Sequence, residues 1–217
     1  MAWRTGSGIS SSDGGMNKPS YGMPVFFNGA FYVLYGTPTA VGTTATETSI
    51  FTTDTSITTP ITVQAGIPPY PSNPGSTRQI PPSALNTLGT MFNFDFYGSV
   101  KTNGTPNLTF RLGLVNAAGT FTAIADTTAT AMTSEATACF LHVGGGFSIA
   151  KVGTAGSINA FIEYDYAPTG ITVNSPVLAT TSFDLTAPYT LDIRATWSAS
   201  DAANIVTINW GSIEVIG

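Results

Sequence analysis

The sequence has a single cysteine, Cys139, and a single histidine, His142, among its 217 residues. One cysteine cannot form an internal disulfide, so the fold does not require an oxidising compartment. One cysteine and one histidine also fall short of the set of ligands that a zinc site uses. We therefore expect no disulfide framework, no bound metal and no other cofactor.

Charge is scarce as well, at 9% of the chain against about 25% in typical globular domains. Seven basic and twelve acidic residues leave a net charge of -5, so no cationic surface is available to displace counterions from a phosphate backbone. The most apolar run, Val25 to Tyr35, has 11 residues, well short of the roughly 20 that a membrane-spanning helix needs. The first residues lack the apolar segment of a secretory signal. We expect no nucleic-acid partner and no membrane partner.

Threonine is abundant instead, with 35 residues, and its β-branched side chain favours strands over helix interiors. Apolar and polar residues alternate with a period of two, which is typical of strands that bury one face. This alternation covers residues 92–97, 108–114, 158–166 and 191–197. Turn signals separate these segments. The pattern predicts an all-β protein, an antiparallel two-sheet sandwich, and eight or nine strands at this spacing favour a jelly roll.

The last strand carries a break in this alternation. Val206, Ile208 and Trp210 occupy even positions, whereas Ile213 and Val215 occupy odd ones. We expect a β-bulge at Gly211 and Ser212 that returns the apolar residues to the core side.

The chain divides into an extended N-terminal arm, residues 1–45, and a jelly-roll domain, residues 46–217. The arm is rich in glycine, serine and proline, and its aromatic stretch is too apolar to stay solvated. We expect the arm to leave the domain and lie along another surface; an edge strand of the core is the alternative for this stretch. The candidate partner-binding residues are Phe26, Phe27, Phe31, Tyr32 and Tyr35.

The stretch ACFLHVGGGF, residues 138–147, has the His-Gly signature of the oxyanion loop in lipase-like hydrolases. The chain has neither a G-x-S-x-G elbow nor a second histidine. Strand alternation also sends Cys139 and His142 to opposite faces of a sheet. We expect no catalytic residue, no cofactor-binding residue and no metal ligand here; the glycines let the strand bend or a neighbouring backbone approach closely.

Glu163 and Asp165 share a strand face, which is compatible with a glycosidase-like carboxylate pair. The same face of a jelly roll is commonly just solvated, and Asp192 with Arg194 on another strand indicates cross-strand charge pairing, so we favour a structural role for these carboxylates.

An ordered set of motifs extends from Thr46 to Gly217. It comprises ETSIF (Glu47 to Phe51), RQIPPSALNTLGTMFNFDFYGSV (Arg78 to Val100), NLTFRLGL (Asn107 to Leu114), AIADTTAT (Ala123 to Thr130) and YTLDIRATWSASDAANIVTINWGSIEVIG (Tyr189 to Gly217). In this order the motifs resemble the jelly-roll structural proteins of tailed-bacteriophage virions, such as capsid decoration (cement) proteins and head spikes.

The resemblance implies a viral structural protein that is not an enzyme and that forms a homotrimer. Its partners would be copies of itself and the major capsid protein or other virion proteins. It would lie on the capsid surface of a virion assembled in the host cytoplasm. We expect a decoration protein that binds and stabilises the outer surface of a phage head. The alternative is a receptor- or glycan-binding module of a head spike or tail fibre, in which exposed Trp and Tyr would stack on sugars. A polysaccharide-cleaving enzyme is a third hypothesis, which only Glu163 and Asp165 support.

Overall fold

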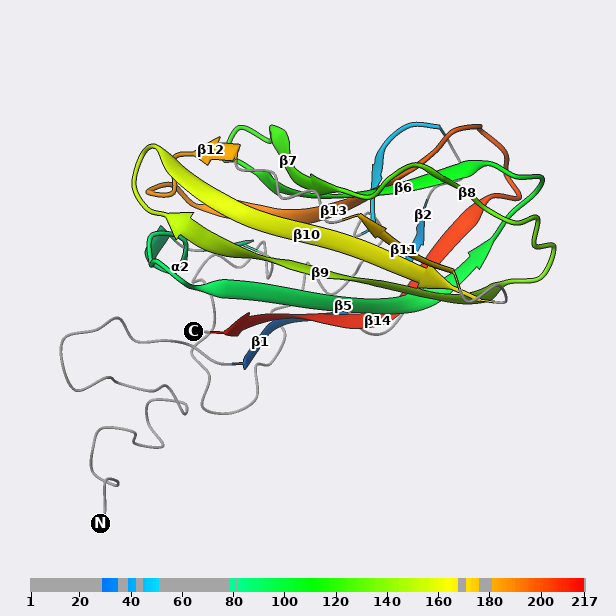
Figure 1. Cartoon of the computed structure of the whole chain (residues 1–217), viewed down its shortest axis with the longest axis horizontal. Helices are drawn as coiled ribbons and strands as arrows, with labels where there is room; N and C mark the ends of the chain where they lie inside the picture. Colours follow the sequence, from blue (N-terminus) through cyan, green and yellow to red (C-terminus); the bar gives the residue numbers. More distant parts are fainter. Residues whose placement is uncertain are drawn as a thin grey trace, which may run out of the picture.

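The protein is a β-sandwich of two antiparallel sheets packed face to face (Figure 1). The computed structural model describes residues 29–34, 39–41, 45–50, 79–80, 82–167, 171–175 and 181–216. The all-β class and the two antiparallel sheets are as predicted from the alternation of apolar residues. Within the described residues, no helix is long and apolar enough to cross a membrane.

The larger sheet has eight strands in the described part of the chain, in the order β1-β14-β5-β9-β10-β11, with β2 also paired to β14 and β12 to β10. Its strands are β1 (Gly29–Leu34), β2 (Thr39–Val41), β5 (Met91–Lys101), β9 (Cys139–Lys151), β10 (Gly156–Tyr166), β11 (Ile171–Ser175), β12 (Thr181–Phe183) and β14 (Ile205–Ile216). The central four strands, β14, β5, β9 and β10, are the long ones, so they form a broad surface for side chains.

The smaller sheet has six strands among the described residues, in the order β3-β13-β6-β7, with β4 paired to β13 and β8 to β6. Its strands are β3 (Thr48–Ser49), β4 (Gln79–Ile80), β6 (Asn107–Val115), β7 (Phe121–Asp126), β8 (Thr130–Ala131) and β13 (Tyr189–Trp197). The single helical turn α2 (Pro82–Leu85) precedes β5 and buries Ala84 and Leu85.

The core fills the space between the sheets with one side-chain set from each strand, as the period-two pattern requires. Fully buried large side chains come from both sheets and include Phe92, Phe94, Phe96, Phe110, Tyr164, Tyr166 and Trp197. Each such side chain contributes on the order of 1.5–3 kcal/mol through burial. The inward-facing residues predicted for the four alternating segments are confirmed by this core.

The bulge in the last strand lies earlier than predicted. The register between β14 and β5 shifts between Ile208 and Trp210 rather than at Gly211 and Ser212. Two consecutive residues, Asn209 and Trp210, therefore face solvent, and Trp210 is 56% exposed. The prediction that Trp210 points to the core was wrong, because parity alone does not reveal which residue a bulge takes out of the pairing.

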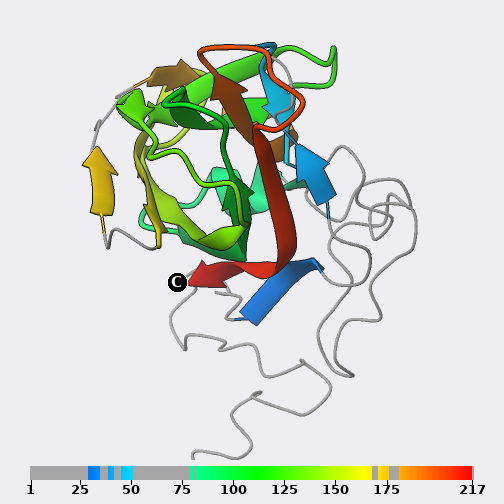
Figure 2. The same cartoon turned by 90° about the vertical axis from the view of Figure 1, so that its right-hand side faces the viewer.

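The N-terminal stretch contributes two strands at one edge of the larger sheet. β1 pairs with residues 211–215 of β14, and β2 pairs with residues 206–208 of the same strand. Seen end on, β1 lies beside the end of β14 (Figure 2). The backbones of Phe31 and Tyr32 belong to β1, which is the pairing that the edge-strand alternative predicts. Phe26, Phe27 and Tyr35 lie outside the described residues, and the arm of residues 1–45 stays a prediction.

The chain changes sheets several times. It passes from β5 to the smaller sheet with β6, returns with β9, crosses again with β13 and returns with β14. The jelly-roll topology itself stays a prediction.

Candidate functional site

A row of four side chains crosses the outer face of the larger sheet. Cross-strand pairing aligns Trp210 of β14 with Tyr97 of β5, Tyr97 with His142 of β9, and His142 with Asp165 of β10. Side chains of directly paired residues on one face of a sheet lie within contact distance. The four adjacent strands each contribute one side chain, and together these form a continuous row. We call this set the Trp210 row.

Three rings of the Trp210 row stack on one another. The centroids of Trp210 and Tyr97 are 4.1 Å apart with an interplanar angle of 21°, and those of Tyr97 and His142 are 4.7 Å apart with an angle of 20°. Phe140 lies beside the row, 6.3 Å from Tyr97 between centroids. Aromatic pairs of this kind add about 0.5–1.5 kcal/mol each beyond burial, so the row has a defined geometry.

The imidazole of His142 lies between two carboxylates from neighbouring strands. Its Nε2 is 2.9 Å from Asp95 Oδ1, and its Nδ1 is 3.6 Å from Asp165 Oδ2. The second oxygen of Asp165, Oδ1, is shielded from solvent and has no hydrogen-bond partner within the described part of the chain. The row therefore ends in a carboxylate that lies beside His142, at a distance longer than a hydrogen bond.

The three glycines after His142 make this arrangement possible. A Cβ atom at Gly144 would lie 3.0 Å from His142 Cε1 and 3.3 Å from Asp95 Oδ1, so the missing side chain leaves room for both groups. At Gly145 and Gly146 a Cβ would lie 2.5 Å from the backbone oxygens of Phe161 and Phe92, respectively. The prediction that these glycines admit neighbouring backbone closely is confirmed.

The other residues weighed for chemistry do not join the Trp210 row as a catalytic set. Cys139 packs against the core side, whereas His142 lies on the outer face, as the alternation predicted. Glu163 is paired with Gly144, and Asp165 is paired with His142, so both carboxylates lie on the outer face of β10. No group of three or more His, Cys, Asp or Glu side chains among the described residues is arranged to hold a metal ion.

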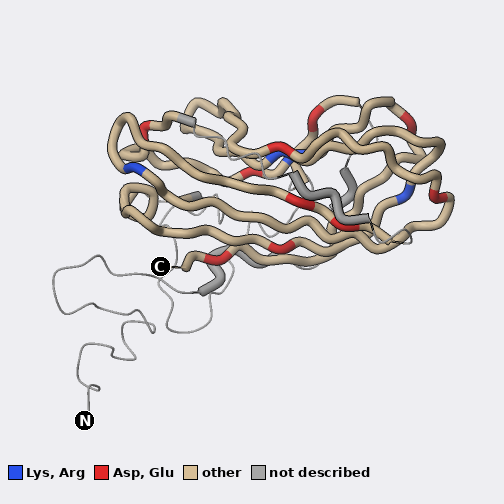
Figure 3. Tube along the Cα trace, viewed as in Figure 1, with Lys and Arg blue, Asp and Glu red and all other residues tan. Residues whose placement is uncertain are grey.

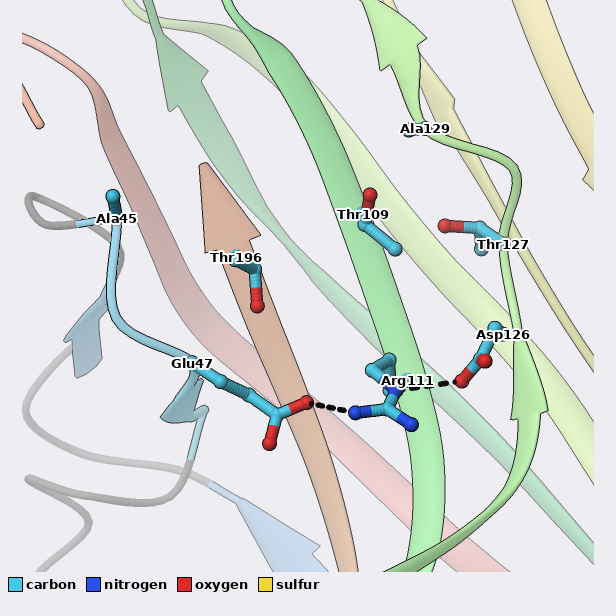
Figure 4. Close-up of a pocket in the computed structure, with 8 residues that line it drawn as sticks. All are labelled: Ala45, Glu47, Thr109, Arg111, Asp126, Thr127, Ala129 and Thr196. Atoms are coloured by element: carbon cyan, nitrogen blue, oxygen red, sulfur yellow. Dashed lines mark hydrogen bonds and ion pairs between the residues drawn. The ribbon is translucent and has the colours of Figure 1, made fainter. Parts of the chain in front are cut away.

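The outer face of the smaller sheet carries a second polar cluster. Arg111 of β6 donates hydrogen bonds of 2.8 Å to Glu47 and to Asp126, beside a shallow hollow of about 540 Å³ (Figure 4). The bond to Asp126, with a smaller contribution from Glu47, raises the pKa of the Arg111 guanidinium against the effect of its partial burial. Threonines complete the lining, among them Thr109 and Thr196.

Arg194 of β13 extends this second cluster. Its guanidinium lies 3.9 Å from the centroid of the Phe121 ring and donates to Asp192 at 2.8 Å and to Glu47 at 3.2 Å. Both arginines are thus already engaged by carboxylates of the same sheet. The cluster ties β13, β6 and β7 to Glu47, which is a structural arrangement rather than a ligand site. The sequence indicated charge pairing for Asp192 and Arg194. In the structure Arg194 pairs with Asp192 of the same strand and with Glu47.

Taken together, the architecture is that of an antiparallel β-sandwich with a polar aromatic row on one outer face and an ion-pair cluster on the other. Comparison with protein families, with curated proteins and with solved structures finds no match to this chain.

Proposed function

We propose that this chain is a non-enzymatic structural protein of a tailed-phage virion, a decoration protein that binds the outer surface of the head. The proposal rests on the ordered motifs between Thr46 and Gly217 and on the family that they resemble. Its partners are copies of itself, as a homotrimer, and the major capsid protein. It lies on the capsid surface of a particle that is assembled in the host cytoplasm.

The strand order supports the jelly-roll part of this proposal. Leaving β10 to β12 aside, the larger sheet runs from β1 and β2 through β14 and β5 to β9, and the smaller from β3 and β4 through β13 and β6 to β7. Each sheet alternates strands from early and late parts of the chain, as the two Greek keys of a jelly roll require. The strands β10 to β12 are additions to this plan.

One observation carries the proposal of self-assembly: an apolar end of the sandwich, made of Leu88, Met91, Val152 and Ile216, in which all four side chains are exposed. Met91 is paired with Ile216 across β5 and β14. Residues 86–90 lie against 149–153, because Gly89 N donates to Ile149 O at 3.0 Å and Gly153 N donates to Asn86 Oδ1 at 2.9 Å. Exposed apolar patches of this kind mark contacts with other proteins.

Low charge supports the same conclusion. Acidic residues are sparse over the described part of the trace, and basic ones are fewer still (Figure 3). Lys151 is the one charged residue in the segments 86–91 and 149–153, which belong to the apolar end. Interface cores are depleted in charge in the same way.

The experiment is light scattering on the purified full chain. We expect about three times the subunit mass of 22.5 kDa. The double variant Met91→Ser, Val152→Ser should be a folded monomer, whereas Phe140→Ser, an exposed aromatic away from the apolar end, should stay trimeric. A monomeric native chain at micromolar concentration contradicts the homotrimer, and a trimeric double variant contradicts the apolar end as its contact.

The copy number per particle then separates the two virion roles. Quantitative mass spectrometry of native particles should find hundreds of copies of a decoration protein and only a few of a spike or fibre module. The Trp210 row is the one observation that favours the second role, a glycan-binding module.

A further inference from the structure

We propose that the Trp210 row, with Asp95 beside it, is a binding site for a short neutral oligosaccharide. This inference concerns a ligand of the outer face of the larger sheet. It deepens the glycan-binding alternative and does not depend on how the protein assembles through its apolar end.

The first element of the site is an indole of which the described residues occupy one face. Tyr97 stacks on one face of Trp210 at 4.1 Å, yet Trp210 is 56% exposed. The exposure therefore comes mainly from the opposite face and the ring edge. The face of an aromatic ring carries partial negative charge, so it attracts the polarised C–H groups on the apolar side of a pyranose. A solvent-facing tryptophan fixed by a second ring is suited to this contact, because little side-chain entropy remains to be lost on binding.

The second element is a set of hydrogen-bond acceptors at the other end of the row. The carboxylate of Asp165 belongs to a side chain that is 40% exposed, and that of Asp95 to a side chain that is 56% exposed. An ionised carboxylate only accepts hydrogen bonds and has about four lone-pair sites for them. Both carboxylates can therefore accept hydrogen bonds from the hydroxyl groups of a sugar.

His142 positions these acceptors. Its two ring nitrogens lie 2.9 Å from Asp95 Oδ1 and 3.6 Å from Asp165 Oδ2, and its ring stacks on Tyr97. The carboxylates and the indole are therefore part of one continuous contact network on rigid strands. Trp210 and Asp165 lie three strand spacings apart, about 14 Å, which suits a short oligosaccharide better than a single sugar ring.

Charge restricts the ligand to neutral sugars. Asp95, Glu163, Asp165 and Glu214 face outward on these strands, and acidic positions are spread along the larger sheet in Figure 3. Within the described Trp210 row no Lys or Arg is present to pair with a sialic acid, a uronic acid or a sulfate. Anionic sugars would meet like charge, whereas neutral hydroxyl groups meet acceptors.

The test is binding of the full chain to an array of neutral oligosaccharides (glucans, galactans, mannans and N-acetylglucosamine oligomers), with polygalacturonate as the acidic probe. Titration calorimetry then measures the affinity for the best neutral ligand. We expect at least one neutral oligosaccharide to bind and polygalacturonate not to bind.

Variants assign the binding to the Trp210 row. We expect Trp210→Ala and Asp165→Asn each to weaken binding at least tenfold, while Trp210→Phe retains part of the affinity. The matched control is Phe161→Ala, because Phe161 is an exposed aromatic on the same face but outside the row. Circular dichroism of each variant verifies that it is folded.

Three results overturn the inference: no neutral oligosaccharide on the array binds, polygalacturonate binds more tightly than the neutral sugars, or Phe161→Ala weakens binding as much as Trp210→Ala. Light scattering on the same samples keeps the two proposals apart. Loss of sugar binding in a trimer refutes only the site, and sugar binding by a monomer refutes only the homotrimer.

Discussion

Substituting Gly98 by alanine should be among the most damaging single changes in the larger sheet. Gly98 lies in β5 between β14 and β9, paired with Ile208 on one side and Leu141 on the other. A Cβ atom at this position would lie 1.8 Å from the backbone oxygen of Thr207. This contact is backbone, so no change of side-chain rotamer can relieve it.

The expected cost follows from how far the strands must separate. Real Cβ contacts essentially never fall below 3.0 Å, so β14 has to move away from β5 by more than about 1 Å next to its bulge. A shift of that size breaks about two ladder hydrogen bonds at roughly 1 kcal/mol each and loosens the packing behind them. We expect a loss of about 3 kcal/mol in the free energy of unfolding, or a fall in Tm of roughly 6–12 °C for a chain of this length.

Gly104→Ala is the matched control. Gly104 has a φ of +69° and no atom within 4 Å of an added Cβ, so alanine there costs only the left-handed backbone, about 1–2 kcal/mol. Urea denaturation of both variants measures the difference. If Gly98→Ala is no less stable than Gly104→Ala, the close approach of β14 to β5 is wrong.

Two further predictions concern buried polar groups. Burial raises the pKa of Tyr164 to about 12, so the phenol of the unfolded chain ionises first as the pH rises. The free energy of unfolding should therefore be unaffected below pH 10 and fall by up to about 3 kcal/mol between pH 10 and 12. Urea titrations of Tyr164→Phe should lack this fall, and an identical fall in the variant would refute the assignment. Arg194→Ala should cost roughly 2–4 kcal/mol, because Asp192 is only 5% exposed and loses its 2.8 Å bond from Arg194. Arg194→Lys should recover part of that loss, and a cost below about 0.5 kcal/mol for the alanine variant in thermal melts would show that the pair contributes little.

The inward faces of the long strands could be predicted from the sequence, because burial imposes a period of two on each strand separately. Phe92, Phe94 and Phe96 alternate strictly, and all three are buried. The opposite faces of Cys139 and His142 follow from the same rule. One strand read alone is sufficient for this kind of prediction.

The Trp210 row could not be predicted, because it depends on the register between strands. Trp210, Tyr97 and His142 are far apart in the sequence, and only pairing across β14, β5 and β9 aligns them. A single sequence does not show which residues are paired. The bulge added a second obstacle, since its position at Asn209, two residues before Gly211, turned Trp210 outward. The pair of adjacent exposed residues, Asn209 and Trp210, is visible only in the structure.

The same limit applies to the ion-pair cluster. Glu47 binds Arg111 and Arg194 from two different strands, although it lies far from both in the sequence. The sequence indicated charge pairing near Asp192 but not the partner that joins the strands.

The position of β14 between β5 and the N-terminal strands has a consequence for synthesis. β5 gains this neighbour only after β14, which begins at Ile205, has emerged from the ribosome. At about 5–20 residues per second, the roughly one hundred residues between them take on the order of 5–20 s to translate. During that interval one edge of β5, a strand rich in phenylalanine, is unpaired. β1 and β2 also lack their pairing partner, because both pair with β14. Slow translation or premature arrest in this interval should therefore favour aggregation, and chaperones that shield strand edges should raise the yield of folded protein.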